Sequence, residues 1–385
     1  MTPEPRISRA ARSIPPFLAM EVLERAQQLE SEGADIVHLE LGEPDFDVPE
    51  CVRRAAEAAM REGRTHYTHS LGITVLREAI ADAYQERYGV AVESGRIIIT
   101  AGTSAGMCLL MAALLEPGDE VLLSNPRYPC YPNFVAAFNG VPISFPVSAA
   151  NGFRYDPSEV RRRLTRRTAA LLVNSPANPT GAIQPREVLA ELAALGPPLI
   201  SDEIYHGLEY GERAASVLEV TDHAFVLDGF SKRYAMTGWR LGWLVVPPEY
   251  VRPIQKLQQN LFICAGSVAQ WAGVAALRQA GADVRRMQAE YAQRRRALLD
   301  GVRRLGFPVP GEPEGAYYVL ADAHHVDRDS VRLAGRLLEE AGVAVTPGAD
   351  FGPAAEGYLR FSFANALDRI AEGLRRLDAW LARRG

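Results

Sequence analysis

Apolar residues recur along the first three quarters of the chain with two periods that alternate. A spacing of three and four residues, typical of helices with one buried face, predicts helices over residues 17–32, 50–61, 75–88 and 105–115. Short β-rich runs between turn residues predict strands at 36–41, 96–100, 120–124, 169–174, 199–203, 224–229 and 240–246. Strands that alternate with helices indicate a mainly parallel sheet. The last two strands leave no room for a helix between them, which allows one antiparallel edge.

After residue 279 the pattern becomes that of a smaller unit. It predicts a long amphipathic helix at 282–305, strands at 317–320 and 358–363, and helices at 330–341 and 367–384. We therefore expect an α/β protein with a large domain over residues 46–285. A smaller α/β domain is expected from both chain ends, residues 1–45 and 286–385.

Composition and charge exclude several classes of partner. The 385 residues are 48% hydrophobic, and 42 basic against 47 acidic side chains give a net charge of −5. This balance gives no reason to expect nucleic acid or an anionic membrane as a partner. The longest apolar run, 107–115, is about half of the ~20 residues that span a bilayer. The N-terminal segment has no apolar signal core, and the four cysteines form no CxxC pair, so we expect a reduced, cytoplasmic protein.

The chain contains only two lysines, Lys232 and Lys256. Neither stands in a Gly-Lys-Ser/Thr segment, so no P-loop is present. Lys256 lies among glutamines on a helix, whereas Lys232 follows the apolar strand 224–229. Arginine cannot replace lysine where a neutral amine must form. Lys232 therefore indicates amine chemistry of the Schiff-base kind.

Other polar residues follow the carboxyl ends of predicted strands, where ligands bind in open α/β sheets. The turn Gly102-Thr103-Ser104 opens a helix, and its free N–H groups favour an anion. An ordinary helix cap is the simpler explanation of this turn taken alone. The remaining strand-end candidates are Asn178, Asp202, Tyr205, Ser231 and Lys232.

The same turn also allows a different enzyme. Residues 102–106 read GxSxG, which is the pattern of a hydrolase nucleophile. Ser104 would then need Asp322 with His324 or His325, but no HGGG-like segment precedes the serine. This hypothesis also gives no role to Lys232 or Asp202. The histidines lack partners at metal-ligand spacing, so no metal is expected.

Long segments of the chain resemble the class I and II aminotransferases, the pyridoxal-phosphate enzymes of fold type I. The resemblance runs through nearly the whole chain, from LGEPDF at 41–46 to GYLRFS at 357–362. Its most specific segments are NSPANPTG at 174–181, SDEIY at 201–205 and GFSKRYAMTGWRLG at 229–242.

This resemblance implies a role for each matching residue. Lys232 would bind pyridoxal 5′-phosphate as a Schiff base and then shuttle a proton between the substrate α-carbon and cofactor C4′. Asp202 would pair with the ring nitrogen, Asn178 and Tyr205 would bind the phenolic oxygen, and Tyr128 would stack on the ring. The phosphate would be bound by Gly102, Thr103, Ser104, Ser231 and Arg240, with Tyr67 supplied by the second subunit of a homodimer.

The resemblance also implies the reaction. Arg360, with the backbone of Gly42 and with Asn178, would bind the substrate α-carboxylate. An L-amino acid and a 2-oxo acid, such as 2-oxoglutarate or pyruvate, would exchange an amino group by a ping-pong mechanism. Aromatic residues near matched segments, Tyr317, Tyr318 and Phe351, would shape the side-chain pocket or serve only as core. A β-lyase or decarboxylase on the same fold would use the same cofactor residues and stays an alternative.

Overall fold

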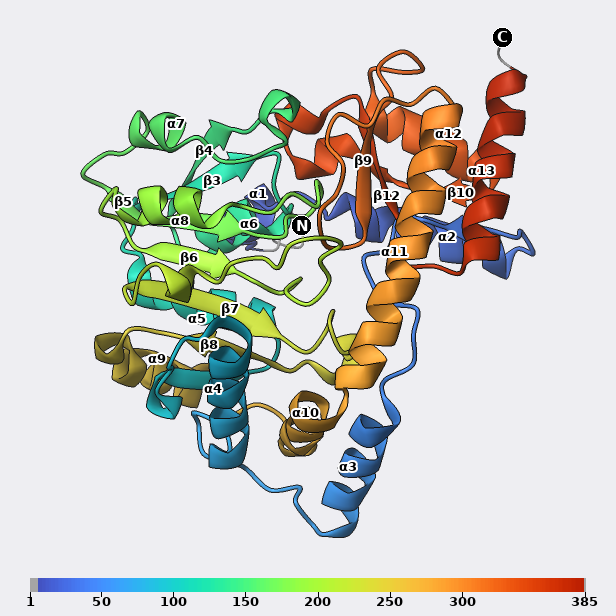
Figure 1. The fold of residues 1–385 in the computed structure, drawn as a ribbon. Coiled ribbons are helices and arrows are strands. Elements are labelled where there is room, and N and C mark those ends of the chain that lie inside the picture. The colour runs from blue at the N-terminus through green and yellow to red at the C-terminus, as the bar shows by residue number, and fades with distance from the viewer. Residues whose placement is uncertain (1–5, 384–385) are drawn as a thin grey trace, which may run out of the picture.

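The computed structural model describes residues 6–383, so the ends of the expected small domain, 1–5 and 384–385, lie outside the described residues. Its main feature is a seven-stranded sheet in the order β2-β8-β7-β6-β5-β3-β4, with helices on both faces (Figure 1). The strands are β2 Ile97–Thr100, β3 Glu120–Asn125, β4 Val141–Pro146, β5 Thr168–Asn174, β6 Leu199–Asp202, β7 Ala224–Gly229 and β8 Gly242–Val245.

Side chains of neighbouring residues in these strands enter two separate cores. Val121 and Leu123 of β3 pack on one face, and Leu122 packs on the other. Both faces are covered, which explains why the strands are continuous apolar runs in the sequence. The first face is covered by α5 Thr103–Leu114, α6 Cys130–Ala137 and α9 Pro248–Leu261, and the second by α4 Thr74–Tyr88, α8 Arg186–Ala193 and α10 Ser267–Gln279.

Strand directions bring the polar strand ends to one edge of this sheet. Strands β7, β6, β5, β3 and β4 are parallel, and β8 is antiparallel to both β7 and β2. Two reversals make β2 parallel to β7, so the carboxyl end of β2 lies at the same edge as those of β5, β6 and β7. The register pairs Gly242 with both Thr100 and Gly229, so the segment that enters β8 also lies at this edge.

The antiparallel strand is therefore confirmed, but its expected place at the edge is wrong. Strand β8 lies inside the sheet because β2, from much earlier in the chain, pairs with its free side. The segment 36–41 also differs from expectation. Only β1, Val37–His38, is a strand, and it pairs in parallel with β10, Val343–Ala344, outside the large sheet.

The remaining chain forms a smaller unit beside the carboxyl edge (Figure 1). Its three-stranded antiparallel sheet has the order β11-β12-β9, with β9 Tyr318–Asp322, β11 Thr346–Pro347 and β12 Tyr358–Ser362. Helices α2 Leu18–Ser31, α12 Ser330–Ala341 and α13 Leu367–Ala382 pack around it, and the long α11 Gly281–Arg304 runs between the two units. The pairing of β1 with β10 joins the N-terminal segment to the C-terminal part of the chain.

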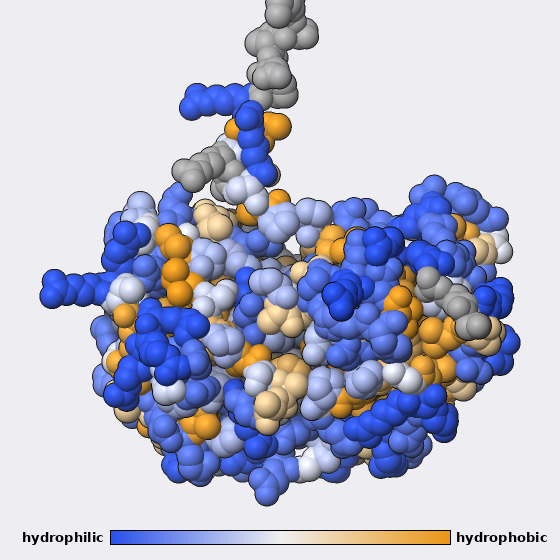
Figure 2. Space-filling view, turned by 90° about the horizontal axis from the view of Figure 1, so that it is seen from above, coloured by the Kyte–Doolittle hydropathy of each residue, from blue (hydrophilic) through white to orange (hydrophobic). Residues whose placement is uncertain are grey.

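Three further α-helices and several 3₁₀ helices complete the fold. The other α-helices are α1 Arg9–Ser13, α3 Glu50–Arg61 and α7 Pro157–Arg161. The 3₁₀ helices are Ser94–Arg96, Ala149–Asn151, Val217–Glu219, Thr237–Trp239, Gly348–Phe351 and Pro353–Ala355. Among the described residues, no helix is both long and apolar enough to cross a membrane. Seen from above, apolar residues reach the surface in separate groups among hydrophilic ones (Figure 2).

Candidate active site

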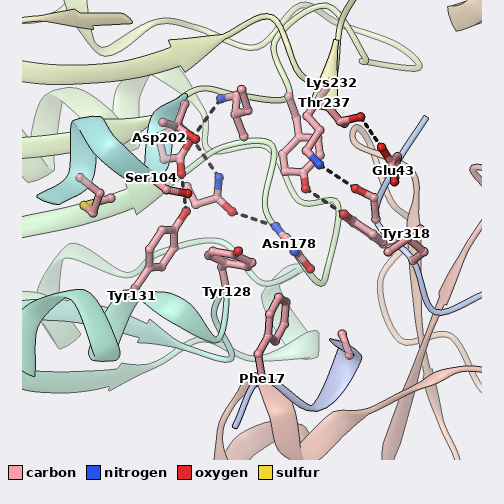
Figure 3. Close-up of a pocket in the computed structure, with 18 of the residues that line it drawn as sticks. Phe17, Glu43, Ser104, Tyr128, Tyr131, Asn178, Asp202, Lys232, Thr237 and Tyr318 are labelled. Carbon is pink, nitrogen blue, oxygen red and sulfur yellow. Dashed lines mark hydrogen bonds between the residues drawn. The ribbon is translucent and has the colours of Figure 1, made fainter. Parts of the chain in front are cut away.

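A cavity of about 270 Å³ lies where the carboxyl edge of the large sheet meets the smaller unit. Large-sheet strand ends and the helices that follow them supply one wall, and the segments at residues 17–20 and 41–43, Tyr318 and Arg360 supply the other (Figure 3). Of the residues predicted from sequence, those that line the cavity are Gly42, Thr103, Ser104, Tyr128, Asn178, Asp202, Tyr205, Tyr318, Lys232 and Arg360.

Lys232 enters the cavity from the turn that follows β7. Its Nζ donates a hydrogen bond of 2.6 Å to the carbonyl oxygen of Gly42. Burial lowers the pKa of Lys232 to about 8; Glu43 opposes this shift, and the positive charges of Arg360 and Arg240 add to it. A primary amine with this pKa is partly neutral near pH 7, which is the state that acts as a nucleophile or base.

Asp202 ends β6, and its carboxylate is buried at the far side of the cavity from Glu43 (Figure 3). Tyr131 donates a hydrogen bond of 2.8 Å to its Oδ2, and the Ile204 N–H donates one of 3.2 Å to Oδ1. Burial raises the pKa of Asp202 to about 6, against these hydrogen bonds and the charge of Lys232. A cationic partner beside this buried carboxylate would stabilise its ionised form and lower its pKa.

The turn between β2 and α5 has the form of an anion site. Gly102 has φ +84°, and a Cβ there would lie 2.6 Å from Nη2 of Arg240, so only glycine lets the guanidinium approach this closely. Arg240 itself has φ +50° and donates a hydrogen bond of 3.0 Å to the Thr237 carbonyl. Thr103 and Ser104 begin α5 and line the cavity, so the positive end of the helix faces it. Ser231 is buried immediately before Lys232.

Three further side chains surround the space between Lys232 and Asp202. The ring of Tyr128 makes edge contacts with Phe17 and Tyr131, at centroid distances of 5.9 and 5.2 Å. Tyr205 and Tyr318 share a hydrogen bond of 2.8 Å between their hydroxyls, and burial raises the pKa of Tyr205 well above its ordinary value.

Asn178 is fixed at both its backbone and its side chain. Its N–H donates to Oδ1 of Asn174, at 2.9 Å, and its own Oδ1 accepts a hydrogen bond of 3.0 Å from Arg360. Since the amide oxygen is engaged with Arg360, the amide NH₂ is the group left to donate into the cavity.

Arg360, on β12, is fully buried between two aromatic rings. Its guanidinium carbon lies 4.3 Å from the ring centroid of Tyr318 and 5.0 Å from that of Phe351. It donates to Asn178 Oδ1, to Thr346 Oγ1 at 2.9 Å and to the Glu40 carbonyl. A guanidinium has five N–H groups; three are used here, and Nε has no partner among the described residues. Arg360 thus retains donors for an anion in the cavity.

The backbone of Gly42 closes the cavity next to Lys232. Its carbonyl accepts from Lys232 and from the Tyr317 hydroxyl, at 2.9 Å, and a Cβ on this residue would collide with the Tyr318 hydroxyl. Tyr67 lies elsewhere: its side chain is 80% exposed and does not line this cavity.

Several cavity residues were not identified from the sequence. Tyr131 follows Tyr128 by three residues at the start of α6, and this helical spacing could have indicated that both face the same way. Phe17 and the hydrogen-bonded pair Glu43 and Thr237 gave no comparable signal, because their segments meet only in the folded chain.

The arrangement expected for a serine hydrolase is absent from the described residues. Ser104 lines the same cavity as Lys232, whereas His324 lines a separate shallow depression with His325. His324 is paired with Asp322, at 2.7 Å, but no hydrogen bond joins Ser104 to a histidine among the described residues. Within residues 6–383, Ser104 therefore lacks the histidine that this hydrolase hypothesis requires.

Comparison with known proteins gives a consistent result. The family model Aminotransferase class I and II matches residues 34–377. The chain is 39% identical to the aspartate/prephenate aminotransferase of Thermus thermophilus, over 98% of this chain and 99% of that protein. It is also 39% identical to the valine–pyruvate aminotransferase of Mycobacterium tuberculosis, over 96% and 97% of the two chains. The solved structure of Thermus thermophilus aspartate aminotransferase with maleate superposes with a TM-score of 0.94, at 39% identity, covering 97% of this chain and 99% of that one.

Proposed function

The chain belongs to the class I and II aminotransferases, a pyridoxal-phosphate-dependent family, and from this premise we propose how its own residues bind cofactor and substrate. The comparisons support transfer of an amino group between an amino acid and a 2-oxo acid. They do not support the lyase, decarboxylase or serine hydrolase alternatives.

The residues around the cavity fit pyridoxal 5′-phosphate. Lys232 would bind the cofactor covalently, and Asp202 would pair with its ring nitrogen. The ring would lie against Tyr128, with Tyr205 and the Asn178 amide donating to its phenolic oxygen. The backbone N–H groups of the first turn of α5 have no partner within the helix, and Arg240 lies close to Gly102. These features support a phosphate there, bound by Gly102, Thr103, Ser104, Ser231 and Arg240.

When bound, the cofactor supplies an electron sink for negative charge that develops at the substrate α-carbon. The chain's own groups do the remaining work. Arg360 would bind the α-carboxylate, with Gly42 and Asn178 beside it, and so fix the direction of the α-hydrogen. Lys232 Nζ would accept that proton, and its pKa of about 8 suits a base that must also release it.

The aromatic contacts around Arg360 explain how this group is positioned. Tyr318 and Phe351 pack on its faces, and Thr346 and the Glu40 carbonyl bind Nη2. These contacts immobilise the guanidinium before a substrate arrives, so little side-chain entropy is lost on binding. The arrangement supports a ping-pong cycle in which amino acid and 2-oxo acid use one carboxylate site in turn.

We further propose the organisation expected from the sequence: a large domain of residues 46–285 and a small domain from 1–45 and 286–385. Tyr67, exposed in a single chain, would reach the phosphate of the second subunit of a homodimer. All four cysteines are free, which supports a cytoplasmic, reducing location. The acceptor would be a 2-oxo acid such as 2-oxoglutarate or pyruvate.

One observation supports the proposal most strongly: Asp202 at the end of β6, Lys232 just after β7 and Arg360 within β12 of the smaller unit line one cavity. The test is a single turnover of the cofactor-loaded enzyme with an L-amino acid. Transamination predicts one equivalent of 2-oxo acid, retention of the amino group on the protein and no free ammonia. Release of ammonia with pyruvate, and immediate return to the starting spectrum, would instead show β-elimination.

The two lysines provide a matched pair of variants for this assay. Lys232→Arg should abolish turnover, because a guanidinium stays protonated and cannot act as nucleophile or base. Lys256→Arg changes an exposed residue of α9 and should retain activity. Turnover by Lys232→Arg comparable to that of Lys256→Arg would contradict the proposed role of Lys232.

A further inference from the structure

The segment 201–206 presents polar side chains in two directions. Asp202 and Tyr205 line the cavity, whereas Glu203 and His206 are also buried but do not line it. Burial of such groups costs free energy unless hydrogen bonds compensate for it. The partners of Glu203 and His206 therefore indicate what these two side chains do.

The hydrogen bonds of His206 fix which of its ring nitrogens carries the proton. Nε2 lies 2.9 Å from the carbonyl oxygen of Ser175, which can only accept, so Nε2 donates. Burial lowers the pKa of His206 to about 4; Glu209 opposes this shift and Arg87 adds to it. The ring is therefore neutral, and Nδ1 accepts from the Tyr88 hydroxyl, at 2.6 Å. The Tyr88 oxygen in turn accepts from Arg87 Nε, at 3.0 Å, so one chain of donors runs from Arg87 to the Ser175 carbonyl.

Glu203 faces the same ring but does not replace Tyr88 as its partner. Its Oε2 is 3.6 Å from Nδ1 of His206, which is too long for a hydrogen bond. Its other oxygen, Oε1, accepts from a hydroxyl and an N–H at residues 216–217, at 3.1 and 2.9 Å. Glu203 thus binds its segment to this turn, whereas His206 reaches a different neighbour.

That neighbour is the segment 174–178, and the two segments carry the donors expected for the phenolic oxygen of the cofactor, Asn178 on one and Tyr205 on the other. The strand pairing of β5 with β6 ends where these segments begin. Beyond it, the Ser175 N–H donates to the carbonyl preceding Glu203, at 3.3 Å, and the Ser175 carbonyl accepts from His206. The spacing of the two segments past the ends of their strands therefore depends on His206.

We propose that His206 is a positioning residue for the cofactor: through the Ser175 carbonyl, it fixes how Asn178 and Tyr205 approach the phenolic oxygen. This inference rests on the proposed function and adds to it a residue outside the cavity. A donor to that oxygen stabilises its negative charge, which opposes protonation of the nitrogen that joins the cofactor to Lys232. Hydrogen bonds weaken steeply as their geometry departs from the ideal, so a small shift between the segments would weaken a donor. Loss of the His206 bond should then raise the pH at which this nitrogen loses its proton.

The experiment compares two amide variants whose NH₂ groups lie at different points. In His206→Gln the NH₂ lies near the place of Nε2 and still donates to Ser175, whereas in His206→Asn it is one methylene short. The pH midpoint of the absorbance change of the bound cofactor is measured in each cofactor-loaded enzyme. His206→Asn should raise this midpoint by about half a pH unit or more, as expected for a weakened hydrogen bond to a charged group. His206→Gln should keep the midpoint of the parent.

Tyr88→Phe is the matched control for a purely structural role. It removes the partner of Nδ1 but leaves the bond from Nε2 to Ser175 in place. It should lower the unfolding temperature, as His206→Asn does, without moving the midpoint.

The outcomes separate this inference from the proposed function. An unmoved midpoint in His206→Asn, or an equal rise in His206→Gln or Tyr88→Phe, would overturn the role of His206. If His206→Asn does not fold, the other two variants decide: a raised midpoint in either overturns the inference, and the parent's midpoint in both supports it. A parent protein that binds no cofactor through Lys232 would instead refute the proposed function.

Discussion

Replacing Arg360 by lysine keeps a positive charge but removes the planar group that is expected to bind the substrate carboxylate. The guanidinium is held by three hydrogen bonds, to Asn178, Thr346 and the Glu40 carbonyl. It also packs against two aromatic rings. The aliphatic part of lysine can fill most of this space, so we expect the fold to be retained.

The size of the effect follows from the donors that Arg360 has left. Among the described residues, two of its five N–H groups carry no hydrogen bond, and we expect a substrate carboxylate to engage them. A hydrogen bond to a charged group contributes roughly 1.5–3 kcal/mol. A lysine ammonium would replace one of two such bonds at best and would lie at a different point. We therefore expect a loss of about 3 kcal/mol, which is ~100-fold in kcat/KM since 1.4 kcal/mol is tenfold.

The assay is a single-turnover titration of the cofactor-loaded enzyme with an amino acid, followed by the cofactor's absorbance. Arg360→Lys should lose ~100-fold in kcat/KM and bind cofactor with unchanged affinity. Arg375→Lys, which replaces an exposed arginine paired with Glu372, should behave as the parent enzyme. A change below threefold in Arg360→Lys, or an equal loss of cofactor affinity, would refute the assignment of Arg360 to the substrate.

Three other predictions concern cofactor binding. Tyr131→Phe removes a hydrogen bond that lowers the pKa of Asp202, so the acid limb of cofactor affinity against pH should move up by about one unit. Gly102→Ala places a Cβ 2.6 Å from Arg240 at a positive φ, so the cofactor dissociation constant should rise about tenfold and the strained backbone should lower the unfolding temperature. Below the Lys232 pKa of about 8, the neutral amine increases tenfold per pH unit. The rate of covalent cofactor binding to the apoprotein should therefore rise with pH and level off above about 8.

Each of these predictions has an outcome that contradicts it. If the acid limb of cofactor affinity against pH does not move in Tyr131→Phe, the Tyr131 hydroxyl does not lower the pKa of Asp202. Gly335→Ala is the control for Gly102→Ala, since a Cβ there meets no atom within 4 Å. An equal rise of the cofactor dissociation constant in both variants would show that the φ of Gly102 and its approach to Arg240 do not cause the effect. A binding rate that falls or stays flat between pH 6 and 8 would contradict a lowered pKa at Lys232.

Residues at the ends of buried strands could be predicted well from the sequence. The bounds of β7, Ala224–Gly229, agree with the predicted strand, and Lys232 follows it at the edge where the cavity lies. Strands covered on both faces are continuous apolar runs, so the polar residue at which each run stops marks the ligand edge. Asp202 at the end of β6 is a second example.

Contacts between distant segments could not be predicted in this way. Arg360 is held by the carbonyl of Glu40, 320 residues earlier, and this depends on the pairing of chain ends. The interior position of β8 depends in the same way on β2, since the pattern of apolar residues along the sequence predicts a strand but not which strands pair with it. Strand β4 was missed because its run contains two prolines, Pro142 and Pro146, and lies at the sheet edge, where prolines are tolerated. The role of Tyr67 stays a prediction.

The central claim is that Lys232 binds pyridoxal 5′-phosphate covalently, and the chain's two lysines allow a direct test. The cofactor-loaded protein is reduced with borohydride, digested and mapped by mass spectrometry, with Lys256 as the internal control. The account predicts one modified peptide, containing Lys232, and an unmodified peptide containing Lys256. Modification of Lys256 with Lys232 left free, or a protein that retains no cofactor after reduction, would contradict it.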